Sequence, residues 1–317
     1  MSTTRNTLTP DARAMVQTIA VEGSFAAAAR KLGLVPSALT YRVRQMEDAL
    51  DVLLFDRSSR QASLTIAGNE LLREGSRLLL ELDAIANRVK RVATGWEPQL
   101  TIAVDGIISR ATVMELCEAF FAQNAPTQIK LRDESLSGTL RALTSGQADL
   151  AIGMGMETGT AAGLQGKAMG RLAFVYAVAP HHPLAAASEP LSDDLLARYR
   201  AVAVADTVHS ASALSFGLLS GQDVFTVPDM TAKLDAQLRG LGGGFVPQAM
   251  AQGFIDTGRL VVKRVQRPER IARPHYAWRA DGRSHLGRAL QWWLKQLESP
   301  ATRAALLHQR RSAHSPE

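Results

Sequence analysis

The stretch that most constrains this chain is residues 24–47, whose sequence predicts two short helices joined by a tight turn. Ser24 can accept hydrogen bonds from the free amides of a starting helix, and Gly33 can adopt the left-handed conformation that ends it. Pro36 suits the first turn of the second helix. In that helix apolar residues recur at spacings of four, three and four, at Leu39, Val43, Met46 and Leu50. The pair therefore has the dimensions of a helix-turn-helix.

The outward face of the second helix carries small, hydroxylated or cationic side chains. Such side chains approach base edges and phosphates when a helix lies in the major groove of DNA. A solvated helix face is the alternative interpretation, but the alanines at 26–29 make the partner helix thin and let the second helix protrude. We therefore predict DNA contacts in this region, at Ser24, Ser37, Ala38, Tyr41, Arg42, Arg44 and Gln45.

Two further elements flank this pair. Residues 9–11, Thr-Pro-Asp, are typical of a helix start and predict a first helix ahead of it. Residues 53–55 and 63–65 enclose a polar tip, which predicts a short hairpin, or wing. Arg57 and Arg60 project from that tip and can take phosphates or an adjacent minor groove. An ordinary polar turn is the alternative.

Residues 66–93 predict one long helix, capped by Thr65 and roughly 40 Å in length. Its apolar residues alternate spacings of four and three, which is typical of a coiled-coil seam, at Leu71, Gly75, Leu78, Leu82, Ile85, Val89 and Val92. A small DNA-binding domain cannot cover so long a stripe, so we expect a dimer that presents two recognition helices to a two-fold operator. The alternative is that the stripe packs within one chain.

Four segments carry a family resemblance: FAAAA at 25–29, SALTYRVRQME at 37–47, LFDR at 54–57 and LTIAG at 64–68. Together they resemble the winged helix-turn-helix of LysR-type transcriptional regulators. The family usually has Ser or Thr and then Gln where this chain has Val35 and Pro36, and Gly where it has Asp51. The resemblance implies the family's mode of docking on DNA, without the base contact that the glutamine normally makes.

Length and charge set the outer limits. A chain of 317 residues, 46% of them hydrophobic, exceeds one ordinary domain and can bury more than one core. The sequence has no signal peptide and no long apolar span, and its single cysteine, Cys117, excludes an internal disulfide framework, so we expect a cytoplasmic protein. Residues 1–95, 96–258 and 259–317 carry net charges of +3, −6 and +9, and the basic N-terminal part agrees with DNA binding.

Beyond residue 95 strand and helix signals alternate. Strands are expected at 100–104, 128–132 and 149–152, with helices at 109–123 and 137–145, which predicts a parallel sheet covered on both faces. A second lobe of the same kind starts near residue 173, and residues 275–297 return to the first lobe. The fold expected is α/β: an N-terminal winged helix-turn-helix, a long linker helix, and a two-lobed α/β domain that can close by a hinge.

Two serines follow the first two strands of this domain. Ser109 and Ser137 are each placed to cap the next helix, and hydroxyls and free amides facing one crevice favour a small anion or polar ligand. Residues 146–152, 182–184 and 240–247 also resemble the LysR-type effector domain, which is similar to periplasmic binding proteins. The resemblance implies an effector site formed by both lobes, at Ile107, Ile108, Ser109, Ser135, Ser137, Thr207, His209 and Phe245.

Other chemistry is not supported by context. The glycine-rich residues 240–244 lack the Lys-Ser/Thr of a phosphate loop, and His181 and His182 have no partner at zinc-ligand spacing. Cys117 lies among apolar residues of an expected helix, which favours burial over redox sensing. We expect no catalytic site, no metal and no cofactor.

The sequence thus predicts a transcription factor that responds to a small-molecule effector. The alternative is an enzyme or solute-binding module fused to a DNA-binding head, and a constitutive architectural DNA binder is a third reading. Expected partners are an operator duplex, an effector, a second copy in a dimer or a tetramer of two dimers, and RNA polymerase, with no membrane. Expected domains are 1–65 for DNA binding, 66–95 for the linker helix, 96–300 for effector binding and 301–317 for a tail. The first lobe would comprise about 96–172 and 268–300, and the second about 173–267.

Overall fold

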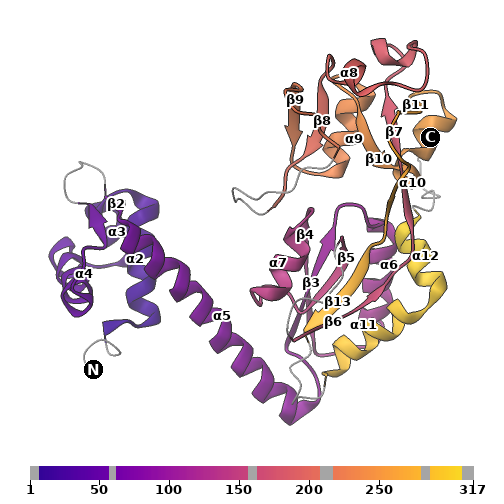
Figure 1. Ribbon diagram of the computed structural model, residues 1–317. Helices are drawn as coiled ribbons and strands as arrows, with labels where there is room; N and C mark the ends of the chain where they lie inside the picture. Colours follow the sequence, from indigo (N-terminus) through magenta and orange to yellow (C-terminus); the bar gives the residue numbers. More distant parts are fainter. Residues whose placement is uncertain (1–6, 57–61, 156–162, 208–216, 280–285, 309–317) are drawn as a thin grey trace. The chain divides into compact units, whose positions relative to one another are not determined.

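The computed structural model describes residues 7–56, 62–155, 163–207, 217–279 and 286–308 (Figure 1). It divides into two compact units, residues 1–86 and 87–317. The helix α5 extends from the first unit into the second.

The first unit is a three-helix core with a small wing. Its elements are α2 (Pro10–Glu22), α3 (Phe25–Leu32), α4 (Pro36–Leu50), β1 (Phe55–Asp56), β2 (Ser63–Leu64) and the start of α5 (Ile66–Thr94). The expected caps are confirmed, because Thr9 and Ser24 accept from Ala12 N and Ala27 N at 3.2 and 3.1 Å, and Gly33 has φ 67°. The strands β1 and β2 pair antiparallel, which confirms the base of the wing.

The helix α5 begins as predicted, with Thr65 Oγ1 accepting from Gly68 N at 3.0 Å. Its first turns lie on the core of the first unit, where Leu71 packs among the buried residues. Farther along, the seam is exposed: Leu78 is 59% exposed and Leu82 is 47% exposed. One chain therefore covers only the beginning of the predicted stripe.

The first lobe of the second unit is built on one five-stranded sheet. Its strands are β3 (Gln99–Asp105), β4 (Gln128–Glu134), β5 (Leu150–Met154), β6 (Leu164–Ala168) and β13 (His275–Arg279), in the order β4-β3-β5-β13-β6. β3 runs parallel to β4 and β5, whereas β13 runs antiparallel to β5 and β6. The three strands expected from the sequence are therefore parallel, as predicted, and among the five strands of this sheet only β13 runs in the opposite direction, because the chain re-enters this lobe from the second one.

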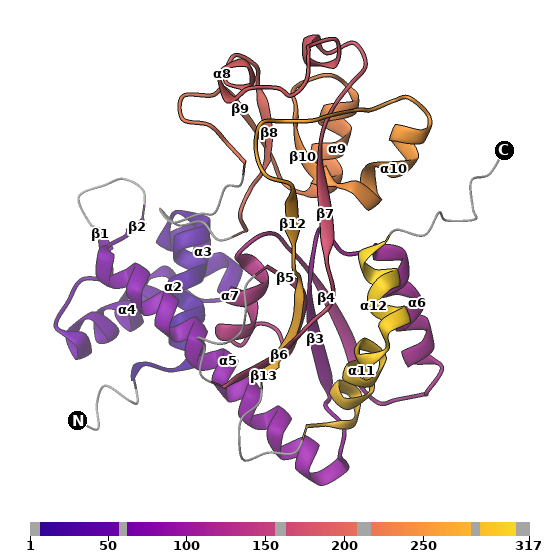
Figure 2. The ribbon, with the colours of Figure 1, turned by 45° about the vertical axis from the view of Figure 1, so that its right-hand side comes forward.

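Alternate residues of these strands face opposite layers. Ile102 and Val104 lie in a core with α6 (Arg110–Phe121), α11 (Arg288–Glu298) and α12 (Pro300–Leu307). Ala103 and Ala151 face α7 (Gly138–Thr144) on the other side. Small residues on that face let α7 lie close to the sheet (Figure 2).

The chain after residue 300 differs from the expected tail. Pro300–Leu307 forms α12, which Ser299 caps by accepting from Thr302 N at 3.4 Å. Leu306 and Leu307 are 0% and 4% exposed within the first-lobe core. Burial of these two leucines holds this segment in place.

The second lobe has an antiparallel sheet and a parallel strand pair. Its strands are β7 (Leu172–Val178), β8 (Ala201–Val204), β9 (Val224–Val227), β10 (Gly244–Pro247), β11 (Val261–Lys263) and β12 (Arg270–Ala272), and its helices are η2 (Pro183–Ala185), α8 (Asp193–Leu196), α9 (Met230–Leu238) and α10 (Gln248–Asp256). β7 pairs with β10, β11 and β12, and β8 pairs parallel with β9. A bridge between Ala201 and Gly243 connects the two groups of strands.

Two neighbouring strand connections join the lobes, as expected. β6 leads into β7 and β12 leads into β13, and both connections lie side by side because Met169 N donates to Pro274 O at 2.8 Å. β12 pairs with β7, so the second lobe continues to Ala272 and not to the expected residue 267. Figure 2 shows these two segments passing from one lobe to the other.

Candidate nucleic-acid interface and ligand cavity

The helix α4 presents a polar stripe directly opposite its buried one. Leu39, Val43 and Met46 are at most 2% exposed. At 100° per residue, Ser37, Tyr41 and Arg44 lie on the far side of the helix, and all three are exposed. Tyr41 is 63% exposed, which is high for an aromatic side chain. These side chains therefore point away from the fold.

The other predicted DNA contacts have different positions. Arg42 and Gln45 line a shallow depression that Thr9 and Asp11 at the start of α2 also line, so they lie at the side of α4. Ala38 is half-buried on that same side. The hydroxyl of Ser24 accepts from Ala27 N and serves first as a helix cap. Arg57 and Arg60 lie outside the described residues.

Sequence reasoning missed the residue that connects the wing strand β1 to α4. Glu47, at the end of α4, is 4% exposed. Its Oε1 accepts from the backbone amides of Leu54 and Phe55 at 2.8 and 3.4 Å. A buried carboxylate is stable only with such donors, so this contact sets the position of the wing strand. The signal was available, because Glu47 follows Met46 on the apolar side of the helix.

A cavity of about 490 Å³ lies between the two lobes of the second unit. The first lobe contributes the ends of β3, β4 and β5, and the second contributes β8, β12 and α9. Most of its wall is apolar, including Leu136, Leu140, Met154, Phe174 and Met230. This is the position expected for a ligand at the carboxyl ends of the parallel strands.

Two cations lie on the second-lobe wall. Lys233, on α9, is 6% exposed, and burial lowers its pKa to about 8, with the charge of Arg270 adding to the effect. The Arg270 guanidinium lies 4.9 Å from the ring centre of Phe174 and 5.7 Å from that of Phe245. Burial also lowers the pKa of Arg270. Sequence reasoning missed both residues, although Lys233 lies with Leu234 and Ala236 on the buried side of α9.

The first-lobe wall carries one buried acid. Asp105 is 7% exposed at the end of β3 and accepts from Ile107 N at 3.0 Å. Burial raises its pKa to about 7, although the amides of Ile107 and Leu136 favour the charged form. At neutral pH this carboxyl group is therefore partly protonated and can donate a hydrogen bond.

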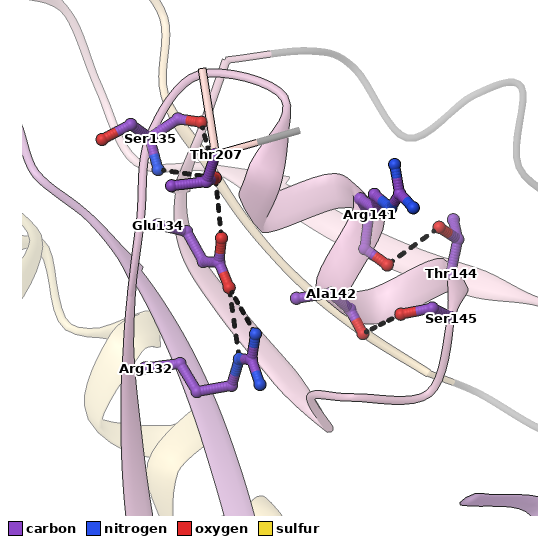
Figure 3. A network of polar contacts seen from close by, with 8 residues as sticks. All are labelled: Arg132, Glu134, Ser135, Arg141, Ala142, Thr144, Ser145 and Thr207. Carbon is purple, nitrogen blue, oxygen red and sulfur yellow. Dashed lines mark hydrogen bonds and ion pairs between the residues drawn. The ribbon is translucent and has the colours of Figure 1, made fainter. Parts of the chain in front are cut away.

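A chain of polar contacts crosses between the lobes beside the cavity (Figure 3). Arg132 Nη2 donates to Glu134 Oε1 at 2.9 Å, and Thr207 Oγ1 donates to Glu134 Oε2 at 2.7 Å. Ser135 N in turn donates to Thr207 Oγ1 at 3.3 Å. A methyl group on Gly138 would overlap Thr207, so the glycine permits this close approach.

Ser137 makes a second contact between the lobes. Its hydroxyl donates to the two carboxylate oxygens of Asp206 at 2.8 and 2.7 Å. It makes no side-chain cap of α7, so the expected capping role is wrong at this position. Sequence reasoning did not identify Asp206, whose place after β8 becomes informative only once the lobes are brought together.

The cavity includes some of the predicted effector residues and leaves out others. Ile107, Ser135, Ser137 and Phe245 line it, and Thr207 contacts Ser135 beside it. The remaining two described residues, Ile108 and Ser109, are both 2% exposed and do not line it. His209 lies outside the described residues.

The backbone at Ser109 contacts α12, a helix that the sequence did not predict. It caps α6 as predicted, accepting from Thr112 N at 3.4 Å. Its own amide donates to Leu306 O at 2.8 Å, and Thr112 Oγ1 donates to Ala305 O at 3.1 Å. The end of α12 therefore covers this helix start, and the equivalence expected between Ser109 and Ser137 is absent.

Family models match both units. The model described as "LysR substrate binding domain" matches residues 93–300, and "Bacterial regulatory helix-turn-helix protein, lysR family" matches residues 11–69. The protein belongs to the LysR family of transcriptional regulators. The resemblance seen in the sequence is thereby confirmed, and so is the expected function of this LysR-type regulator as a transcription regulator with an effector-binding domain.

Relatives and solved structures agree. The regulator is 37% identical over 276 residues to the "Uncharacterized HTH-type transcriptional regulator YeeY" of Escherichia coli K12, covering 87% of this chain and 88% of that protein. It is 36% identical to the "Probable HTH-type transcriptional regulator YhaJ" of the same strain, covering 92% and 96%. Full-length CbnR, solved in complex with its target DNA, has a similar fold, with a TM-score of 0.59, 16% identity, and coverage of 90% of this chain and 98% of that one.

A second solved structure supports the fold in both units. LysG of Corynebacterium glutamicum, solved with bound effector Arg, matches with a TM-score of 0.50 and 22% identity, covering 95% of this chain and 99% of that one. In the part of this chain that the structure describes, no helix combines the length and the apolar character needed to cross a membrane.

Proposed function

We propose that this LysR-type regulator reads operator DNA with the outward stripe of α4 and adjusts promoter activity when an effector occupies the cavity between the lobes. The observation that carries the proposal is the cavity itself, whose wall comes from both lobes and whose rim is bridged by Ser137 and Asp206. A ligand that contacts both lobes binds one arrangement of them more tightly than another. It therefore shifts the population toward that arrangement.

The proposal includes a dimer formed along α5. Leu78, Leu82 and Ile85 are 59%, 47% and 45% exposed, and an apolar stripe of this kind is a common protein–protein contact. A second copy of the chain offers a matching stripe by symmetry. Two α4 helices would then face half-sites one helical turn apart, or a multiple of that distance.

The proposal also assigns a role to each domain and names the partners of the regulator. Residues 1–65 form the DNA-binding head, 66–95 the linker helix and 96–307 the effector domain, which includes α12. Dimers pair into tetramers, and the promoter-bound form contacts RNA polymerase. The site of action is the cytoplasm, where promoter DNA lies.

Footprinting of DNA upstream of the protein's own gene tests the proposal. The full chain is expected to protect two half-sites related by two-fold symmetry. Tyr41→Ala should lose most of this protection while keeping the mass of the unaltered protein, because the Tyr41 side chain is 63% exposed and lies outside the buried core of the first unit. Lys295→Ala, at an exposed position of α11, is the matched control and should protect normally. Equal protection by Tyr41→Ala would remove α4 from the DNA interface.

A further inference from the structure

The chemistry of the cavity wall indicates which class of effector it takes. Lys233 is 6% exposed and lines the cavity. A methyl group on Gly244 would come within 3.3 Å of Lys233 Cε and Nζ, so the lysine lies directly against β10. Among the described residues, none accepts a hydrogen bond from its ammonium group or forms an ion pair with it. A buried ammonium without an acceptor is costly, and proteins rarely retain one without a use.

A second cation is close by. Arg270 lies over the rings of Phe174 and Phe245, and its charge acts on Lys233 in the same direction as burial does. Like charges held together in a region of low dielectric repel each other. The two cations thus place positive charge on one wall of the cavity, where an anionic group would bind favourably.

The described acids near the cavity do not pair with Lys233. Glu134 is engaged by Arg132 and Thr207, and Asp206 accepts from Ser137. Asp105 is across the cavity, bound to a backbone amide. The other charged or titratable groups on the wall are Arg273 and His275, which add no negative charge.

The rest of the wall fits an apolar body. Leu140, Met154 and Met230 surround the space, and its volume of about 490 Å³ suits a molecule of metabolite size. Ser135 adds a polar group on the first-lobe side. The wall therefore has one cationic end and one mainly apolar end.

We propose that the effector is a small organic carboxylate, whose anionic group binds Lys233 and Arg270 and whose apolar body lies against Leu140, Met154 and Met230. This inference rests on the proposed function of the cavity as the effector site. Binding of the carboxylate would supply the acceptor that Lys233 lacks. A charge-assisted hydrogen bond to a buried ammonium is stronger than one between neutral groups, so charge would dominate selectivity.

Three probes of similar shape and different charge test the inference on the full chain. Benzoate, benzamide and benzylamine are compared by thermal shift and calorimetry at millimolar concentration, at pH 7 and matched ionic strength. Benzoate should raise the melting temperature and bind at least about tenfold more tightly than benzamide. Benzylamine should give no shift. Equal binding of benzoate and benzamide, or no binding of benzoate, would overturn the carboxylate assignment.

Variants separate the anion site from the cavity. Lys233→Met should lose the preference for benzoate over benzamide, whereas Lys295→Met, at an exposed position of α11, should keep it. Without any probe, Lys233→Met should melt at a higher temperature than the unaltered protein, because it removes an unpaired buried charge. A lower melting temperature would show that Lys233 has a structural role and would contradict the inference.

A cavity-filling variant distinguishes failure of the inference from failure of the proposed function. Ile107→Trp places a larger side chain at a position that lines the cavity. Loss of all probe binding in this variant, together with equal binding of benzoate and benzamide by the unaltered protein, would leave the cavity as the ligand site and reject only the carboxylate class. Unchanged benzoate binding in Ile107→Trp would reject the cavity as the site, and both proposals with it.

Discussion

Ser137 in the first lobe donates its hydroxyl to the carboxylate of Asp206 in the second lobe, at 2.8 and 2.7 Å. Asp206 is only 9% exposed, so solvent replaces this donor poorly. The contact therefore resists separation of the lobes. Because Ser137 also lines the cavity, the cavity wall and the contact between the lobes share this residue.

Ser137→Ala should lower the free energy of unfolding of the effector unit by about 1–2 kcal/mol, because it removes a donor from a buried carboxylate. Urea denaturation measures the change. Ser145→Ala is the matched control: Ser145 lies at the other end of α7 and donates to Ala142 O within one lobe. Similar losses of unfolding free energy in both variants would mean that the contact between the lobes stabilises the protein no more than a hydrogen bond within one lobe.

Asp105→Asn should stabilise the protein in a pH-dependent way. Burial raises the pKa of Asp105 from 3.8 to about 7, so folding takes up a proton between these values and stability falls as pH rises through that window. Asn cannot ionise and still accepts from Ile107 N. We expect the variant to be more stable than the unaltered protein at pH 8, by up to roughly 4 kcal/mol, with the difference vanishing near pH 4.

Thermal melts at pH 5 and pH 8 measure that effect. Asp256→Asn, at an exposed position of α10, is the control for removing a surface carboxylate and should change the melting temperature much less than Asp105→Asn does at pH 8. A stabilisation by Asp105→Asn that is the same at both pH values would contradict the raised pKa.

Gly68→Ala should destabilise the DNA-binding unit. A methyl group at Gly68 would overlap the carbonyl oxygen of Leu54, which is backbone and cannot rotate away. We expect a loss of about 2–3 kcal/mol, which is typical of overpacking in a well-packed region. Gly253→Ala is the control, since nothing lies within 4 Å of the added methyl group and alanine favours α10. In urea denaturation, the free energy of unfolding should therefore fall in Gly68→Ala and rise slightly in Gly253→Ala.

Arg44 and Arg42 should differ in their effects on DNA binding. Arg44 lies on the outermost stripe of α4, whereas Arg42 lies beside the start of α2. We expect Arg44→Ala to weaken operator binding by about 1–3 kcal/mol and Arg42→Ala to weaken it less. Fluorescence anisotropy over a salt series measures both, and a lost phosphate contact would lower the salt slope by about one. A larger effect of Arg42→Ala would show that α4 contacts DNA with the face that carries Arg42 and not with its outermost stripe.

Leu78→Asp should break the proposed dimer. Leu78 is 59% exposed on the seam of α5, and a carboxylate there would be buried against a second copy. Light scattering should report a smaller mass for this variant. Lys90→Asp, at an exposed position on the same helix outside the seam residues, should leave the mass unchanged. An unaltered mass in Leu78→Asp would reject α5 as the interface.

The DNA-binding unit could be predicted closely from sequence because its signals are local. Thr65 caps α5, Ser24 caps α3, and the buried stripe of α4 has the expected spacing. Each of these depends on residues within a few positions of one another. The strands β6 and β12 were missed because they are short or largely exposed, and they form only by pairing with β13 and β7.

The ligand cavity was less predictable because it depends on contacts between distant segments. Ser109 and Ser137 look equivalent in sequence, yet α12 covers the first, and Asp206 engages the second. Lys233 and Arg270 lie on different elements and become neighbours only when β12 pairs with β7. The local sequence pattern around each residue does not predict that the two lie close together.

The insertion of β13 between β5 and β6 has a consequence for synthesis of the protein. The sheet of the first lobe stays open until residues near the end of the chain arrive, and α11 and α12 close its core later still. On the ribosome, the DNA-binding unit can fold while the effector-binding domain is still incomplete. A product cut short before β13 would keep the complete DNA-binding unit and lack both the strand that completes the first-lobe sheet and part of the cavity wall, including His275.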